Sequence, residues 1–152
     1  MYDKYFIKLI TESNTFDEVC ERLNVIDDKK LLGTYFEWFV HLVLLCDPRY
    51  STIVRHCWLL SDLPVITRNY LQIPVNDIGI DLVIETNDNT FYAVQAKYRK
   101  DLNCVIDWKE LSTFFGLTFG LTNKFKKGIL VTNTINPNKY IKGKSNFIAN
   151  MD

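Results

Sequence analysis

Three polar residues, Asp81, Gln95 and Lys97, lie in two short apolar segments whose composition is typical of β-strands. Asp81 stands among the aliphatic residues of segment 79–84, where an ionised carboxylate is costly unless a cation accompanies it. In segment 91–97 the two-residue period of a strand places Gln95 and Lys97 on the same face. A carboxylate, an amide oxygen and an ammonium together are the groups that metal-assisted phosphodiester hydrolysis uses.

Residues 85–90, Glu-Thr-Asn-Asp-Asn-Thr, separate the two segments and are typical of a turn. We therefore expect the strands to form an antiparallel hairpin. In such a pair, residues equally far from the turn lie side by side, so Asp81 is expected to approach Gln95 and Lys97.

Flanking segments supply the elements that must position these residues. Residues 31–45 are too long for a typical strand and predict a buried helix that ends at Asp47-Pro48, with Glu37 as its conspicuous polar residue. Residues 106–115 predict an amphipathic helix, and 127–134 a further buried strand. The expected order of elements is therefore α-β-β-α-β.

These motifs resemble the PD-(D/E)xK, or restriction-endonuclease-like, superfamily of nucleases, whose D…(E/Q)xK signature is matched by Asp81 and the Gln-Ala-Lys of 95–97. The QxK form after the Gly-Ile-Asp of 79–81 is similar to the Mrr-like branch. Residues 33–37 also resemble the first helix of this branch, which carries the pattern G-x-x-F-E. Over most of its length the chain resembles the N-terminal nuclease domain of type ISP restriction enzymes and of viral superfamily II helicases.

The resemblance implies a restriction-endonuclease-like α/β fold, a three-layer core with a central mixed β-sheet flanked by helices. It also implies a Mg²⁺-dependent deoxyribonuclease, with Mn²⁺ as a substitute. Asp81 is then the main metal ligand and Glu37 a second ligand, while Gln95 and the main-chain carbonyl of Ala96 complete the set. Lys97 orients the attacking water. Gln95 is neutral where many relatives carry an acid, so metal affinity depends on Asp81 and Glu37.

The formal charge is balanced, with 18 basic and 18 acidic residues, which argues against a strongly basic nucleic-acid coat protein. Basic residues nevertheless gather beside the candidate site and in the C-terminal third. The residues expected to contact DNA are Tyr98, Arg99, Lys100 and Lys109. A second basic group serves either DNA binding or solubility and comprises Lys124, Lys126, Lys127, Lys139, Lys142 and Lys144. No feature indicates base-specific contacts, so target choice is assigned to DNA structure, a motor domain or another subunit.

The length of 152 residues and the 47% hydrophobic content fit one domain with a substantial core. We expect residues 1–28 to form a helical extension of two short helices packed on the core, the second capped by Thr15 with Glu18 in the capping-box position. Residues 29–135 form the nuclease-like core, within which 60–76 is expected to be a loop. Residues 136–152 form a basic tail or a linker to a following domain.

Sequence patterns for targeting and for metal binding limit the expected location of the protein and the expected kinds of metal site. The apolar runs are shorter than a bilayer span and no secretion signal is recognisable, so we expect a cytoplasmic protein, or a nuclear or virus-factory one, that is not secreted. The cysteines at 20, 46, 57 and 104 form no CxxC pair, which argues against a zinc site.

Two further functions remain alternatives to a DNA endonuclease. One is a catalytically weak, nuclease-derived module that binds DNA or docks a helicase. The other is a resolvase or an RNA-directed nuclease on the same core. The sequence leaves open the preferred nucleic-acid structure, the sequence specificity and the oligomeric state.

Overall fold

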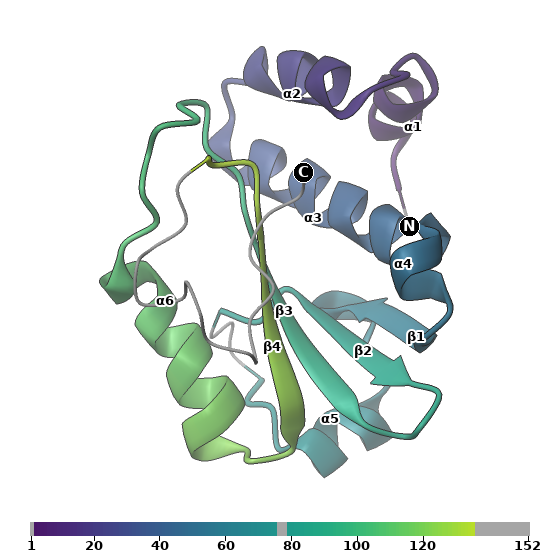
Figure 1. Ribbon diagram of the computed structural model, residues 1–152, viewed down its shortest axis with the longest axis vertical. Helices are drawn as coiled ribbons and strands as arrows, with labels where there is room; N and C mark the ends of the chain where they lie inside the picture. The colour runs from purple at the N-terminus through teal and green to yellow at the C-terminus, as the bar shows by residue number, and fades with distance from the viewer. Residues whose placement is uncertain (1, 76–78, 136–152) are drawn as a thin grey trace.

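The computed structural model of the chain describes residues 2–75 and 79–135, which form a four-stranded sheet covered on both faces by helices (Figure 1). The strands lie in the order β1-β2-β3-β4. Their bounds are β1 Val54–Leu59, β2 Leu82–Thr86, β3 Phe91–Lys97 and β4 Phe125–Thr132. The first two pairings are antiparallel and the third is parallel, so the sheet is mixed, as predicted.

Different helices cover the two faces of the sheet. On one face, α3 packs with α1 and α2 against the sheet; on the other lie α5 and α6. The helices are α1 Lys4–Thr11, α2 Phe16–Asn24, α3 Lys29–Cys46, α4 Pro48–Ser51, α5 Val65–Leu71 and α6 Trp108–Phe115, with a 3₁₀ turn at Leu60–Asp62 and a π-helix at Gly116–Leu121. The predicted three-layer α/β fold is confirmed. None of the helices in the described ranges is long and apolar enough to cross a membrane.

The hairpin of β2 and β3 also confirms its prediction. Val83 pairs with Ala93 and Ile84 with Tyr92, and the turn closes through the Thr86 amide, which donates to the Thr90 carbonyl at 2.9 Å. Asn89 takes the left-handed conformation with φ 58°, which asparagine tolerates better than most residues. Turn chemistry therefore sets the register that brings Asp81 opposite the end of β3.

Helix α3 covers the predicted buried helix and begins two residues earlier. Asp28 caps it, because its carboxylate accepts the amides of Lys30 at 2.8 Å and Leu31 at 3.2 Å. Phe36 and Val40, each 1% exposed, belong to the hydrophobic cluster shared with the sheet. This packing fixes the rotation of α3 and therefore the direction in which Glu37 points.

The two predicted N-terminal helices are present as α1 and α2. Thr15 caps α2 by accepting the Glu18 amide at 3.2 Å, but the Glu18 carboxylate accepts the amide of Asn14 at 2.7 Å instead of closing the expected box on Thr15. Phe6 and Leu23 are buried in the same cluster as α3 and the sheet. The division at residue 28 stays a prediction, and the expected tail at 136–152 lies outside the described residues.

The expectation of a loop at 60–76 is wrong for most of that segment, which holds a 3₁₀ turn and α5. Pro64 precedes the first turn of α5, where a missing amide proton costs nothing. Leu71 anchors the helix at 0% exposure and Gln72 ends it with φ 57°. Strand β1 was also not predicted, since its exposed Arg55 and His56 obscure the alternation of an edge strand.

The Tyr98 hydroxyl links the end of β3 to α2. It donates to the Cys20 carbonyl at 3.0 Å and to Asn24 Oδ1 at 2.9 Å. We expect Tyr98→Phe to lower the free energy of unfolding by about 1–2 kcal/mol, because partly buried acceptors lose their donor. Urea denaturation measures this. The control Tyr5→Phe, at a ring that is 65% exposed, should change stability by less than about 0.5 kcal/mol. Equal effects of the two changes would contradict the link.

Candidate active site

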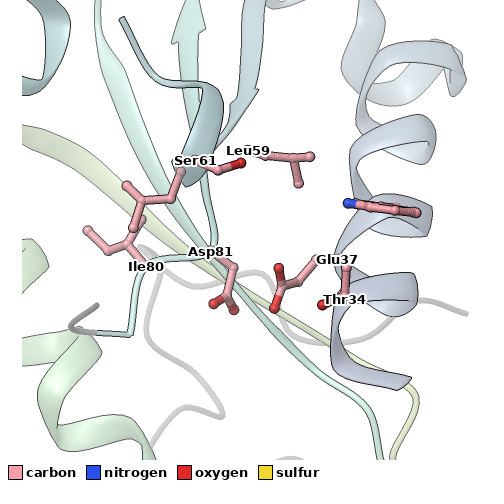
Figure 2. Close-up of a pocket in the computed structure, with 8 residues that line it drawn as sticks. Thr34, Glu37, Leu59, Ser61, Ile80 and Asp81 are labelled. Carbon is pink, nitrogen blue, oxygen red and sulfur yellow. The ribbon is translucent and has the colours of Figure 1, made fainter. Parts of the chain in front are cut away.

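Two carboxylates from distant parts of the chain point toward each other across one pocket (Figure 2). Glu37 comes from the middle of α3, and Asp81 from the residue that precedes β2. Both are only partly buried. The other residues that line this pocket are Thr34, Trp38, Leu59, Leu60, Ser61 and Ile80.

Main-chain hydrogen bonds hold Asp81 on both sides. Its amide donates to the Val94 carbonyl and its carbonyl accepts the Leu60 amide, each at 2.9 Å. Its side-chain Oδ2 accepts the Ala96 amide at 2.7 Å. The carboxylate is thus bound to the main chain of β3, and the position of Asp81 relative to the residues of 95–97 is fixed.

Gly79 makes the approach to Asp81 sterically feasible. Its φ of 87° is unfavourable for residues with a Cβ, and a Cβ there would lie 3.2 Å from Gln95 Nε2. The amide nitrogen of Phe114 in α6 lies 3.5 Å from the same position. A glycine therefore lets the chain turn into Asp81 while packed between β3 and α6.

A second, larger pocket of about 650 Å³ adjoins the first and shares Glu37 and Asp81 with it. Ala96 and Lys97 also line it, so the structure brings four of the five expected catalytic or metal-binding residues to one hollow. Lys97 forms no ion pair within residues 2–75 and 79–135. Its ammonium is therefore free to act on a group that enters the pocket.

Gln95 is the expected site residue that lines neither of the two pockets. It is 2% exposed and packs beneath Gly79. Its Oε1 is buried without a hydrogen-bond partner in the described part of the chain. A buried carbonyl oxygen in this condition is what a bound cation or an ordered water would satisfy.

The donor set fits a hard divalent cation. Within the described ranges no three His, Cys, Asp or Glu side chains gather into a metal-binding group. Two carboxylates that share a pocket nevertheless suit Mg²⁺ or Mn²⁺, since Mg²⁺ keeps several waters and takes one or two carboxylates together with phosphate oxygens. Glu37 and Asp81 are therefore the candidate ligands in the pocket, with Ala96 at its wall, and Gln95 stays a predicted ligand outside both pockets.

Tyr98, expected to contact DNA, also has a structural role in the described part of the chain. It lines the larger pocket but is 8% exposed, and its hydroxyl is bound by Cys20 and Asn24. Burial, and then the nearby Cys20, raises the pKa of Tyr98 far above its ordinary value, so the hydroxyl stays protonated. Tyr98 is therefore not among the residues that we propose to contact DNA.

The other expected DNA contacts divide between the pocket and the surface. Arg99 and Lys100 line the larger pocket. Arg99 is ion-paired with Glu110, and the Lys100 ammonium lies 3.9 Å from Asp27 on the surface. Lys109 is exposed in the first turn of α6 and lines neither pocket.

Two residues near the site were missed from the sequence. Lys29 lines the larger pocket from the first turn of α3. The helical period could have found it, because Lys29, Gly33 and Glu37 are spaced by four. Asn133 bonds the main chain of Arg99. No local pattern indicates that contact, since it depends on the parallel pairing of β3 with β4.

Comparisons with known proteins agree with this geometry. A family model described as restriction endonuclease (Mrr_cat_2) matches residues 45–147, more than half of the chain. The match includes Asp81 and 95–97 but not Glu37. A solved structure, the ATP-dependent type ISP restriction-modification enzyme LlaBIII bound to DNA, shares the fold with a TM-score of 0.64 at 23% identity. The alignment covers 90% of this chain and 8% of that one. No curated protein matches the chain.

The unsatisfied oxygen of Gln95 gives a stability test of the site. In EDTA, Gln95→Glu should lower the free energy of unfolding by about 1–3 kcal/mol, because it places a second acid in a buried position near Asp81. Saturating Mn²⁺ should recover more stability in this variant than it adds to the unaltered protein. Urea denaturation with and without Mn²⁺ measures both quantities.

Gln72→Glu is the matched control, since Gln72 is exposed at the end of α5. Its stability should change by less than about 0.5 kcal/mol and should not gain from Mn²⁺. If Mn²⁺ stabilised all three proteins equally, Gln95 would lie outside the metal site.

Proposed function

The chain belongs to the restriction endonuclease family, and on that basis we propose that it is a Mg²⁺-dependent deoxyribonuclease that hydrolyses phosphodiester bonds within DNA. The observation that carries this proposal is the convergence of Glu37, Asp81 and Lys97 on one open pocket. Asp81 and Glu37 are the proposed metal ligands, assisted by Gln95 and the Ala96 carbonyl. Lys97 is the proposed group that acts on water and on the scissile phosphate.

Each proposed residue has a task that its position supports. When bound, a divalent ion supplies Lewis-acid polarisation of the phosphate and a more acidic water. The hydrogen bond from the Ala96 amide orients the Asp81 carboxylate for its ligand role. Lys97 orients the attacking water and stabilises the charge that develops on the phosphate oxygens. Because the pocket is open, a nucleic-acid strand can reach all of these groups.

Charges around the pocket support a polyanionic substrate. Arg99, Lys100 and Lys29 line it beside Lys97, and Lys109 is exposed in the first turn of α6. The restriction-modification enzyme that shares this fold was solved bound to DNA. We therefore propose DNA as the substrate, which places the activity in the cytoplasm, or in a nucleus or virus factory.

A motor partner is part of the proposal. The enzyme with the similar fold is ATP-dependent, and this chain corresponds to 8% of its length. No feature of the sequence indicates base-specific contacts. We propose that a helicase or motor domain, in the same polypeptide or the same complex, delivers DNA to this site.

One observation favours a second function, a nuclease-derived module that binds DNA or docks a helicase without cutting. Gln95 is neutral and buried away from both pockets, so the carboxylate that many relatives carry at this position is missing. Metal affinity then depends on two carboxylates, and a weak metal site would leave binding without hydrolysis. The cleavage experiment below separates the two functions.

Cleavage of linear and single-stranded DNA in Mg²⁺ or Mn²⁺ tests the nuclease proposal. We expect Asp81→Ala and Lys97→Ala to lower the single-turnover rate by at least about 100-fold, since each removes charge stabilisation that is used in the transition state. EDTA should abolish cutting by the unaltered protein. Branched DNA and RNA, run in parallel, identify the preferred substrate.

Lys8→Ala is the control, because Lys8 is an exposed lysine of α1 that is paired with Glu12 and lines neither pocket. Its rate should stay within about twofold of the unaltered protein. An inert unaltered protein that still binds DNA would favour the module without cutting. Equal cutting by all variants would assign the activity to a contaminant.

Phosphate contact by Lys100 is tested separately by the salt dependence of DNA binding. Lys100→Ala should weaken binding to all sequences alike and reduce the slope of log K against log salt concentration by about 1. Fluorescence anisotropy at several salt concentrations measures this, with Lys8→Ala again as the control. An unchanged slope would remove Lys100 from the interface.

A further inference from the structure

Hydrogen bonds and an ion pair hold both the main chain and the side chain of Arg99. It lies two residues after Lys97 in the segment that leaves β3, and it lines the larger pocket with Glu37 and Asp81. Its side chain is 26% exposed, so its guanidinium is partly enclosed yet open to the pocket. Three groups fix its main chain and side chain.

Asn133 fixes the main chain. This residue directly follows β4 and is 7% exposed. Its Oδ1 accepts the Arg99 amide at 2.8 Å, and its Nδ2 donates to the Arg99 carbonyl at 2.7 Å. The side chain thereby replaces a strand partner just beyond the last β3–β4 pair, Lys97 with Thr132. Figure 1 shows the end of β4 beside the segment that follows β3.

Glu110 and the Tyr98 carbonyl fix the guanidinium. One terminal nitrogen of Arg99 donates to Glu110 Oε1, and the other donates to the Tyr98 carbonyl at 3.0 Å. Glu110 is itself anchored, because its other oxygen accepts the Asp107 amide in the capping box of α6. A guanidinium has five N–H groups, so these bonds leave donors for a further anion.

Lys29 supplies a second cation from a different element. It lies in the first turn of α3, on the helical face that also carries Gly33 and Glu37, and lines the same pocket. An anion held between α3 and the end of β3 would therefore meet two positive charges beside the acidic pair. A planar guanidinium favours phosphate oxygens in particular.

We propose that Arg99, positioned by Asn133 and Glu110, forms with Lys29 a second phosphate site, which binds the DNA phosphate next to the one that is hydrolysed. This inference rests on the proposed function and explains how the DNA strand is oriented at the cleavage site. One phosphate contact lets a strand pivot about the cleavage site. A second contact fixes the direction of the strand, which in-line attack by water requires.

Binding to oligonucleotides with one neutral methylphosphonate at each position in turn tests the site. Experiments in Ca²⁺ or EDTA keep the test independent of cleavage. For the unaltered protein, neutralising one particular phosphate should weaken binding about tenfold. Arg99→Ala should bind the unmodified oligonucleotide about tenfold more weakly and lose its sensitivity to that phosphate. Lys29→Ala should lose part of the same sensitivity.

Arg55→Ala is the matched control, because Arg55 is also held by a carboxylate and an asparagine, Glu85 and Asn89, but at the hairpin end of the sheet. It should keep the full sensitivity of the unaltered protein. If Arg99→Ala responds to every methylphosphonate as the unaltered protein does, the second phosphate site is refuted, while cleavage by the unaltered protein still supports the nuclease. Absence of any DNA binding refutes both proposals.

A double-mutant cycle tests the positioning role of Asn133. Asn133→Ala should weaken binding severalfold and reduce the sensitivity to the same phosphate, yet cost no further affinity when Arg99→Ala is already present. Asn133→Asp, which keeps the acceptor for the Arg99 amide, should show a smaller loss, and urea denaturation identifies any unfolded variant. Equal losses with and without Arg99 would refute positioning through Arg99.

Discussion

The hydrogen bond from the Ala96 amide to the Asp81 carboxylate is the contact on which the site depends. It joins the residue before β2 to the end of β3, where a hydrogen bond to a side chain replaces the main-chain pairing of the hairpin. The bond fixes the carboxylate and orients the neighbouring Lys97 segment at once. Because the main chain of Asp81 is also bound by Val94 and Leu60, main-chain groups hold this residue at three points.

The site is built at some cost to stability. Gln95 buries an oxygen without a partner in the described part of the chain, and Gly79 holds a conformation that few residues tolerate. Such features persist where the surrounding structure determines them, and they gather at functional sites. Here the surrounding structure includes Phe114 of α6, which lies against Gly79 and belongs to the buried cluster that also contains Ile80 and Ala93. The buried cluster and the turn at Gly79 therefore form one arrangement.

Local patterns explain what could be predicted from the sequence. The period of α3, the turn residues at 85–90 and the Asp107 cap of α6 each act within a few residues, so the helices, the hairpin and the approach of Asp81 to Lys97 were predictable. Strand β1 and α5 were missed because polar residues at an edge and a proline at a helix start obscure both periods. The place of Gln95 outside the pockets and the contact of Asn133 with Arg99 depend on packing between distant segments, which no short motif encodes.

The parallel pairing of β3 with β4 has a consequence for how the domain acquires its site. The antiparallel partner of β3 is β2, which is close in the sequence, whereas β4 pairs with β3 only through the longer crossover that contains α6, and closing that crossover costs more entropy than closing the hairpin. Asn133 follows β4, so its contacts with the Arg99 main chain depend on this longer-range pairing. An unfinished or partly folded chain thus holds its acidic residues without an ordered basic wall, and the capacity to engage DNA arises together with the completed fold.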